Sequence, residues 1–276
     1  MGDNRMNKKK EERLVNKLKR LLRRLKVPRY LHKFGPKTYE FYEHLQALVV
    51  KAYCKLSYRR INYILNSLGI RCPSKSALHY TMQRISSAFW QKMLELTSGG
   101  MHYLVALDST GFSRENPSYH YLRRINGAMP KIPVKLSCTF DTKKKKFCAA
   151  KIRVLPAHDI KDAKYLLDKT DAEIAVMDKA YDANWLHEYC LKNNVQAHIP
   201  IREYGKVRHH HYSARRNAAK LFRLRTYHRR ELIESGNSAL KRKYGSSVSS
   251  RSAHMIRAEL YLRLNCNNLF LEIIEI

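Results

Sequence analysis

The chain has 276 residues, 44% of them hydrophobic, which is enough for one large domain and a small one with real cores and excludes a chain that is disordered throughout. Its 54 Lys and Arg stand against 23 Asp and Glu, a formal net charge of +31. This excess predicts a polyanionic partner, DNA or RNA rather than an anionic membrane, because the many Arg and the 18 Tyr suit backbone and base contacts. A basic ribosome-associated protein is the alternative class, although such proteins seldom carry a long patterned α/β region.

The six cysteines form no CxxC pair, which argues against a zinc ribbon and against a disulfide framework. They are interpreted as core thiols in a reducing compartment. No signal peptide is recognised, and no uncharged apolar run approaches the roughly 18 residues of a membrane span. We therefore expect a soluble, cytoplasmic protein associated with the nucleoid.

Residues 1–34 are predicted to form a basic amphipathic arm. They carry 13 Lys or Arg against three acidic residues, and leucines recur at helical spacing from Leu14 to Leu25. Such a helix can lie on DNA or pair with a second copy of itself. The simpler interpretation is a solvated arm with a loosely docked apolar stripe.

Residues 35–98 are predicted to form a helical DNA-binding domain. Helices are expected from Tyr39 to Leu56, from the N-cap Ser57 to Gly69, and from Pro73 through Phe89. Three short helices with a tight link before the third are what a helix-turn-helix unit needs. The third helix offers three residues in particular to a DNA groove, Lys75, His79 and Arg84. A plain three-helix bundle fits the same pattern.

Residues 99–276 are predicted to form an α/β domain that begins after a turn-rich break at 97–100. Strands are expected at 102–112, 134–140, 147–154, 173–177 and 195–201. The first three form a meander, and helices precede the fourth and the fifth. The predicted result is a mixed five-stranded sheet with helices on both faces, on which a closing helix from about Ser252 is expected to pack.

The stretch 227–241, YHRRELIESGNSALK, is predicted to form an amphipathic helix. At about 100° per residue, Tyr227, Arg230, Glu234 and Lys241 share one wholly polar face, and the apolar stripe lies opposite. Gly236 lies in that stripe, where it costs about 1 kcal/mol of helix propensity against Ala. We therefore expect Gly236 to allow close approach to an underlying sheet.

Asp108 and Asp178 each end an apolar strand at its carboxyl edge, where open α/β sheets place their ligands. Neither has an evident capping or turn role. Three other aspartates do, since Asp141 begins a hairpin turn and Asp159 and Asp182 can cap helices. Elimination therefore leaves Asp108 and Asp178 as the candidate pair.

Glu234 is the candidate third acid. Its rival Glu231 lies one turn earlier, but Glu234 lies between Arg230 and Lys241 on the central line of the polar face. Three carboxylates from two strand ends and a helix suit two divalent cations about 3.5 to 4 Å apart. Oxygen-only ligation predicts Mg²⁺ or Mn²⁺ and not Zn²⁺, and such ions support in-line substitution at a phosphodiester.

The spacing Tyr227-x2-Arg230-x3-Glu234-x6-Lys241 resembles the signature around the third acidic residue of prokaryotic insertion-sequence DDE transposases. Asp108 within ALDSTGF and Asp178 within AVMDKAYD resemble the first and second acidic motifs of that family. The inferred element order is also similar to the ribonuclease-H-like catalytic domain of the family. The resemblance covers about residues 100–276.

This resemblance implies that Asp108, Asp178 and Glu234 bind metal, and that Tyr227, Arg230 and Lys241 contact double-stranded DNA near the cleaved phosphate. It also implies that hydrolysis frees a 3′-hydroxyl at each insertion-sequence end and that this hydroxyl attacks target DNA. Family members act as homodimers or larger assemblies on paired ends. A structure-specific nuclease of the same fold and a catalytically inactive DNA-binding regulator are the alternative functions.

Two further features are given simpler interpretations. Trp185 is interpreted as a core residue rather than as a stacking partner for a flipped base. The triplet His209-His210-His211 is interpreted as part of a solvated loop that contacts nucleic acid, because three consecutive residues do not share a face on which they could bind one metal ion.

Overall fold

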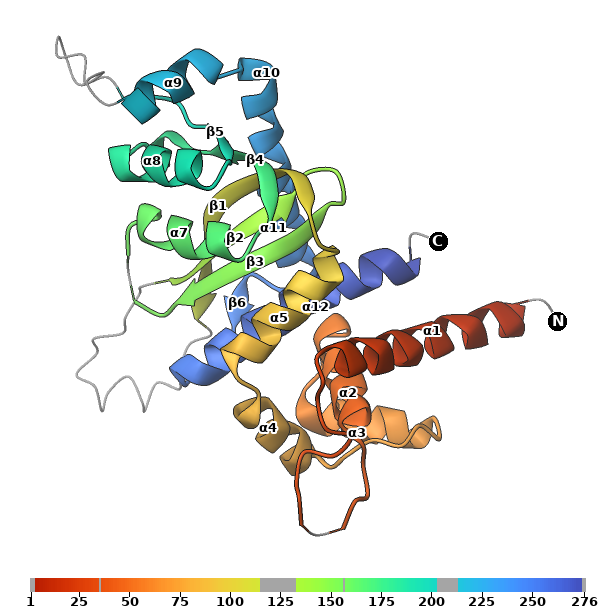
Figure 1. Cartoon of the computed structure of the whole chain (residues 1–276). Helices are drawn as coiled ribbons and strands as arrows, with labels where there is room; N and C mark the ends of the chain where they lie inside the picture. Colours follow the sequence, from red (N-terminus) through yellow and green to blue (C-terminus); the bar gives the residue numbers. More distant parts are fainter. Residues whose placement is uncertain (1–2, 35, 115–132, 156, 203–212, 275–276) are drawn as a thin grey trace, which may run out of the picture. The chain divides into compact units, whose positions relative to one another are not determined.

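The computed structural model describes residues 3–34, 36–114, 133–155, 157–202 and 213–274 (Figure 1). Its contacts divide the chain into two compact units. The helical unit comprises Met1–Thr97, Lys243–Gly245 and Ser250–Ile276, and the sheet unit comprises Ser98–Arg242 and Ser246–Ser249. The helical unit contains the predicted DNA contacts Lys75, His79 and Arg84. The sheet unit contains the six residues predicted to bind metal or the cleaved phosphate, which are Asp108, Asp178, Tyr227, Arg230, Glu234 and Lys241.

The helical unit is built from α1 (Asp3–Arg24), α2 (Phe41–Tyr53), α3 (Tyr58–Ser67), α4 (Lys75–Arg84), α5 (Ser87–Ser98) and α12 (Ala253–Ile274). α1 buries its leucine stripe, including Leu18 and Leu21, as the sequence predicts. The hydroxyl of Ser57 caps α3 by accepting from the Arg60 N–H, and Gly69 ends that segment with a φ of +73°. Within the described residues, no helix combines the length and the apolar composition needed to cross a bilayer.

The predicted third helix is in fact two helices. α4 ends at Arg84 because Ile85 adopts an extended backbone, with ψ of 120°. Ser86 then starts α5, and its hydroxyl accepts from the Phe89 N–H at 3.2 Å. The apolar spacing continues across this break, so periodicity alone does not reveal it.

The closing helix α12 contacts α1, α2 and α4, which corrects the expectation that it packs on the sheet. Most of its length is buried around its whole circumference. Its buried amides hold neighbouring parts of the helical unit, since Asn265 donates to the Trp90 carbonyl at 3.2 Å and Asn268 donates to Thr97 Oγ1 at 3.2 Å. An apolar helix pattern predicts burial but does not identify the core that receives the helix.

The sheet unit contains the mixed sheet flanked by helices that the sequence predicts, with its main strands in the order β3-β2-β1-β4-β5 (Figure 1). The strands are β1 (His102–Arg114), β2 (Val134–Asp141), β3 (Lys146–Arg153), β4 (Ala172–Met177), β5 (Gln196–His198) and β6 (Ser247–Val248). β1, β2 and β3 form an antiparallel meander, whereas β4 and β5 run parallel to β1 and to each other. β6 adds a short parallel pairing at Ser113 and Arg114. β5 is shorter than expected, and Pro200, which lacks an N–H, follows soon after it.

The two faces of the sheet are covered by different helices. α7 (Ile160–Asp168) and α8 (Asn184–Lys192) pack over one face, where Leu107 and Met177 belong to the apolar core. α11 (Glu231–Tyr244) lies over the other face. Adjacent residues of β2 show this alternation, because Ser137 donates to Asp162 of α7 at 2.8 Å whereas Cys138 Sγ is 3.6 Å from Asn237 Oδ1 of α11.

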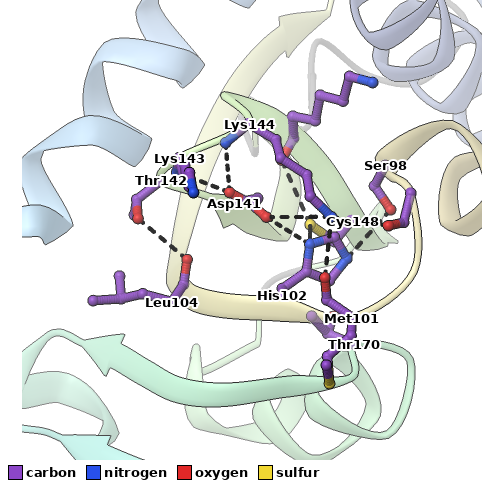
Figure 2. A network of polar contacts seen from close by, with 12 residues as sticks. Ser98, Met101, His102, Leu104, Asp141, Thr142, Lys143, Lys144, Cys148 and Thr170 are labelled. Carbon is purple, nitrogen blue, oxygen red and sulfur yellow. Dashed lines mark hydrogen bonds and ion pairs between the residues drawn. The ribbon is translucent and has the colours of Figure 1, made fainter.

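A buried polar network fixes the amino end of β1 (Figure 2). His102 Nδ1 donates to the Asp141 carboxylate at 2.7 Å, and that carboxylate also accepts from the N–H groups of Lys143 and Lys144. The turn role expected of Asp141 is thereby confirmed. The ammonium group of Lys144 donates to the carbonyls of Gly99 and Met101, which joins the hairpin turn to the segment that enters β1.

Candidate active site

The two strand-end aspartates lie at the same level of adjacent strands. The parallel register of β1 and β4 pairs Ala106 with Val176 and Leu107 with Met177, so the next positions are Asp108 and Asp178. Neighbouring strands lie about 4.8 Å apart, and paired residues point to the same face. Asp108 also pairs with Cys138, which faces α11. The register therefore directs Asp108 towards α11 and brings the Asp178 position beside it.

Asp108 is a partly buried carboxylate in a crowded electrostatic environment. Burial raises its pKa above the usual range, and the nearby carboxylates of Glu234 and Asp159 raise it further. The Ser109 N–H and the charge of Arg230 act in the opposite direction without cancelling the rise. A positive charge placed beside Asp108 would therefore stabilise the ionised form of its carboxylate.

Asp178 has a structural role that the sequence analysis did not assign. It is the N-cap of the short 3₁₀ helix η1 (Lys179–Tyr181), and its Oδ1 accepts from the Lys179 N–H at 2.6 Å. The expectation that Asp178 has no capping role is therefore wrong. A single bond to Oδ1 leaves Oδ2 and further lone pairs of the carboxylate for other partners.

The helical stretch that carries the third acid is divided in two by a tight turn. α10 (Leu224–Tyr227) is followed by the 3₁₀ helix η2 (His228–Arg230) and then by α11, where one continuous helix over 227–241 was expected. α11 packs closely on the sheet at Gly236, where an added Cβ would lie 2.8 Å from Cε2 of Phe140. The close approach predicted for Gly236 is confirmed.

Glu234 is paired with Arg230 at the start of α11. Their Nη2 and Oε1 atoms are 2.5 Å apart, and the side chains are 20% and 52% exposed respectively. The pKa of Arg230 is raised, because the lowering by burial is outweighed by the charge and hydrogen bond of Glu234 and by smaller effects of Tyr227 and Asp178. The rival Glu231 is 73% exposed and pairs only loosely with His228, at 3.7 Å. Arg230 is therefore the cation that all three candidate acids share.

Lys241 lies over the same face of the sheet, and Tyr227 packs against Phe222. The Tyr227 ring centroid is 5.5 Å from that of Phe222. The ammonium group of Lys241 lies 5.4 Å from the ring centroid of Phe112, a buried residue of β1. η2 and α11 thus place Arg230 and Glu234 near Asp108, and Lys241 near Phe112 further along β1.

Asn237 is a residue of this face that the sequence analysis missed. It is buried, and its Nδ2 donates to Asp108 Oδ2 at 3.5 Å while its Oδ1 faces the thiol of Cys138. Its spacing was available as a signal, because positions 230, 234, 237 and 241 follow the alternating three- and four-residue steps of one helix face. Asn237 links α11 directly to the carboxylate that ends the apolar part of β1.

The donor chemistry of the three acids fits a hard divalent cation, since it consists of carboxylate oxygens with Asp108 held in an unfavourable negative environment. Within the residues that the structure describes, however, no three His, Cys, Asp or Glu side chains lie close enough together to hold a metal ion. The three acids are linked through Arg230 rather than gathered into one set of ligands.

In the helical unit, the three predicted DNA contacts lie exposed on α4. Lys75 and His79 line an open hollow of about 780 Å³ together with Tyr58 and Tyr80. The His79 ring packs edge-on against Tyr58 at 5.6 Å, and the Arg84 guanidinium lies 5.5 Å from the Tyr80 ring centroid. These residues form one polar and aromatic surface across α3 and α4.

Several secondary predictions require correction. Trp185 is 44% exposed rather than in the core, because it lies near the start of α8 on its outer side. Asp159 occupies the N-cap position of α7 without a capping bond and pairs with Lys135 instead. Asp182 does not cap α8, whose N-cap is Ala183. The prediction for His209-His210-His211 concerns residues outside those that the structure describes.

Residues 99–269, more than half of the chain, match the family model described as the transposase DDE domain. The chain belongs to the transposase DDE domain family. The matched region includes every predicted residue of the candidate active site. No curated protein matches the sequence.

Solved structures of transposases are among those similar to this transposase-family chain. One is a piggyBac transposase synaptic complex with hairpin DNA, at 10% identity and a TM-score of 0.47, covering 94% of this chain and 71% of that chain. Two are Mos1 complexes, a pre-cleavage transpososome at 12% identity and a paired-end complex with the left transposon end at 13%. Each Mos1 match covers 92% of this chain and 86% of the other, with a TM-score of 0.24.

Proposed function

We propose that this protein is a prokaryotic insertion-sequence transposase that cuts DNA at the ends of its element and transfers the freed 3′-hydroxyls into target DNA. The observation that carries the proposal is the register of β1 and β4, which sets Asp108 beside Asp178 on the face covered by the Arg230 and Glu234 pair. Membership of the transposase DDE domain family supports the same reaction class.

Asp108, Asp178 and Glu234 are proposed to hold two Mg²⁺ or Mn²⁺ ions, which when bound would activate the attacking oxygen and stabilise the leaving one. Burial of Asp108 and the bond from Asn237 orient the first carboxylate. The η1 turn orients the second. Glu234, which is paired with Arg230, is proposed to supply the third carboxylate.

Arg230, Lys241 and Tyr227 are proposed to hold the DNA backbone near the cleaved phosphate. Arg230 is suited to this role because its planar guanidinium can bond a phosphate with two N–H groups at once. A phosphate that draws Arg230 away from Glu234 frees that carboxylate. Arg230 would thereby couple the binding of DNA to the release of Glu234 for metal binding.

The exposed surface of α4 is proposed to bind the terminal repeats. Lys75 and Arg84 supply positive charge, and His79 and Tyr80 line the adjoining hollow. The order of α3, a connecting segment over residues 68–74 and α4 supports a helix-turn-helix interpretation. Action on two ends at once calls for a homodimer or a larger assembly on paired double-stranded ends.

The test is an incubation of the purified protein and Mg²⁺ with labelled DNA from the flanks of its own gene and a supercoiled plasmid, scoring end cleavage and joining separately. Joined products that disappear in EDTA support the transposase. Cleavage without joining would replace it with a structure-specific nuclease of the same fold. Binding with neither product would indicate a catalytically inactive DNA-binding regulator.

A further inference from the structure

A buried aspartate, Asp182, lies four residues beyond Asp178 and is bonded on both carboxylate oxygens. The side chain of Asp182 is fully buried. Its Oδ1 accepts from His187 Nε2 at 2.9 Å, and its Oδ2 accepts from the Arg202 N–H at 2.7 Å. The guanidinium of Arg215 also donates to Oδ2. One carboxylate thus holds α8, the segment that follows β5, and α9 (Ser213–Leu221).

These bonds immobilise the 3₁₀ turn that starts with Asp178. Asp182 is the residue that ends η1, and Arg202 Nε adds a second tie by donating to the Lys179 carbonyl at 2.9 Å. Inside the turn, Tyr181 is almost fully buried, with its hydroxyl 3.4 Å from Ser109 Oγ. Because Ser109 follows Asp108 directly, η1 is attached at one side to the strand that carries Asp108 and at the other to β5 and α9.

The charge of Asp182 is stabilised where it lies. Burial alone would raise its pKa, but the bonds from His187, Arg202 and Arg215 outweigh burial and hold the pKa below the usual range. A buried ionised carboxylate with this set of donors is costly to remove, because His187, Arg202 and Arg215 would all lose the acceptor that they share. The cluster is therefore a rigid support rather than an adjustable contact.

We propose that Asp182 is a positioning residue for the acidic site, which holds Asp178 beside Asp108 by clamping η1. The inference rests on the proposed function and adds to it a support residue that touches neither DNA nor metal. The outer contacts of metal-binding side chains commonly change metal affinity by roughly 10- to 100-fold when they are removed. We expect a loss in that range when Asp182 can no longer hold the turn.

Asp141 provides a matched structural control. It is also a buried aspartate that accepts from a histidine and from backbone N–H groups, but it lies at the amino end of β1 in the network of Figure 2. Both Asp182→Asn and Asp141→Asn should lower the melting temperature. Only Asp182→Asn should weaken a site formed by Asp108 and Asp178.

The experiment measures Mn²⁺ binding to the full chain by electron paramagnetic resonance, well below the melting temperature of each variant. Wild type and Asp141→Asn should bind with similar affinity, and Asp182→Asn should bind roughly tenfold more weakly or worse. Arg215→Ala keeps two of the three bonds to Asp182, so it should lower the affinity for Mn²⁺ by less. If Asp182→Asn does not fold, the Mn²⁺ affinity of Arg215→Ala tests the positioning role instead.

The variant Asp108→Asn distinguishes failure of the proposed metal site from failure of the positioning role of Asp182. If it weakens Mn²⁺ binding while Asp182→Asn, or Arg215→Ala in its place, binds as wild type does, the positioning role is wrong and the proposed metal site stands. An equal loss in Asp141→Asn and Asp182→Asn would also overturn the positioning role. If Asp108→Asn leaves Mn²⁺ binding unchanged, the proposed metal site and the positioning role both fail.

Discussion

Arg230 and Glu234 form a 2.5 Å ion pair across one turn at the start of α11, beside the carboxylate of Asp108. The same guanidinium also interacts electrostatically with Asp178. Arg230 therefore interacts with all three acids that strand register and helix spacing bring to one face of the sheet, but its charge does not offset the rise in the pKa of Asp108.

Arg230→Ala should weaken binding to element-end DNA while leaving the fold intact. The pair with Glu234 is half exposed on the glutamate side, so its loss should cost no more than about 0.5 kcal/mol of unfolding free energy. Arg229→Ala, at an exposed neighbouring position, is the control for loss of charge alone. Fluorescence anisotropy and thermal melting distinguish the outcomes, and a large drop in melting temperature for Arg230→Ala would place the residue in the core instead.

Gly236→Ala should destabilise the sheet unit. An added Cβ would lie 2.8 Å and 3.0 Å from Cε2 and Cζ of Phe140, whose ring is held edge-on against Phe147. Such overpacking typically costs 1–3 kcal/mol, of which about 1 kcal/mol is offset by better helix propensity. Urea unfolding should show a net loss of up to about 2 kcal/mol. Ser238→Ala, exposed on the same helix, should change the free energy by less than about 0.5 kcal/mol.

Asp108→Asn should stabilise the protein at neutral pH. Because the pKa of Asp108 is raised above its usual 3.8 in the folded state, the wild-type protein loses stability as pH rises from that value through the raised one. The side-chain amide introduced by Asp108→Asn does not ionise, so the variant does not lose this stability as pH rises. Urea unfolding should give a difference between the two proteins that is larger at neutral than at mildly acidic pH. A difference that grows towards acid would contradict the burial of the charge.

Lys75→Ala and Arg84→Ala on α4 should each weaken binding to a duplex carrying the terminal repeat and lower the salt dependence of binding by about one unit of slope. Both side chains are exposed, so melting temperatures should stay near that of wild type. Lys92→Ala, an exposed lysine of α5, is the control for net charge. Equal losses in all three variants would mean that charge alone, and not the α4 surface, binds the repeat.

Much of the sheet unit could be predicted because its determinants are local. The apolar runs that end at Asp108 and Asp178 are too short for helices, and a parallel pair of such strands places their ends at one edge. Gly236 was informative for a related reason, since a glycine inside an apolar helix stripe has few roles other than close packing.

The missed features depend on contacts between distant segments. Nothing in the spacing around Asp182 reveals that Arg202 and Arg215 converge on it, and a residue before a predicted helix is more simply assigned as its cap. The capping bond of Asp178 arises from a 3₁₀ turn that apolar periodicity does not register. The place of α12 likewise depends on which core surrounds it rather than on its own pattern.

The central claim is tested most directly by metal-dependent cleavage of labelled element-end DNA with two glutamate variants of one helix. Glu234→Gln should abolish cleavage in Mg²⁺ or Mn²⁺ while DNA binding persists. Glu231→Gln, which alters only an exposed side chain beside His228, should cleave as the wild type does. Cleavage that survives Glu234→Gln, or that proceeds in EDTA, would contradict the assignment of the acidic site.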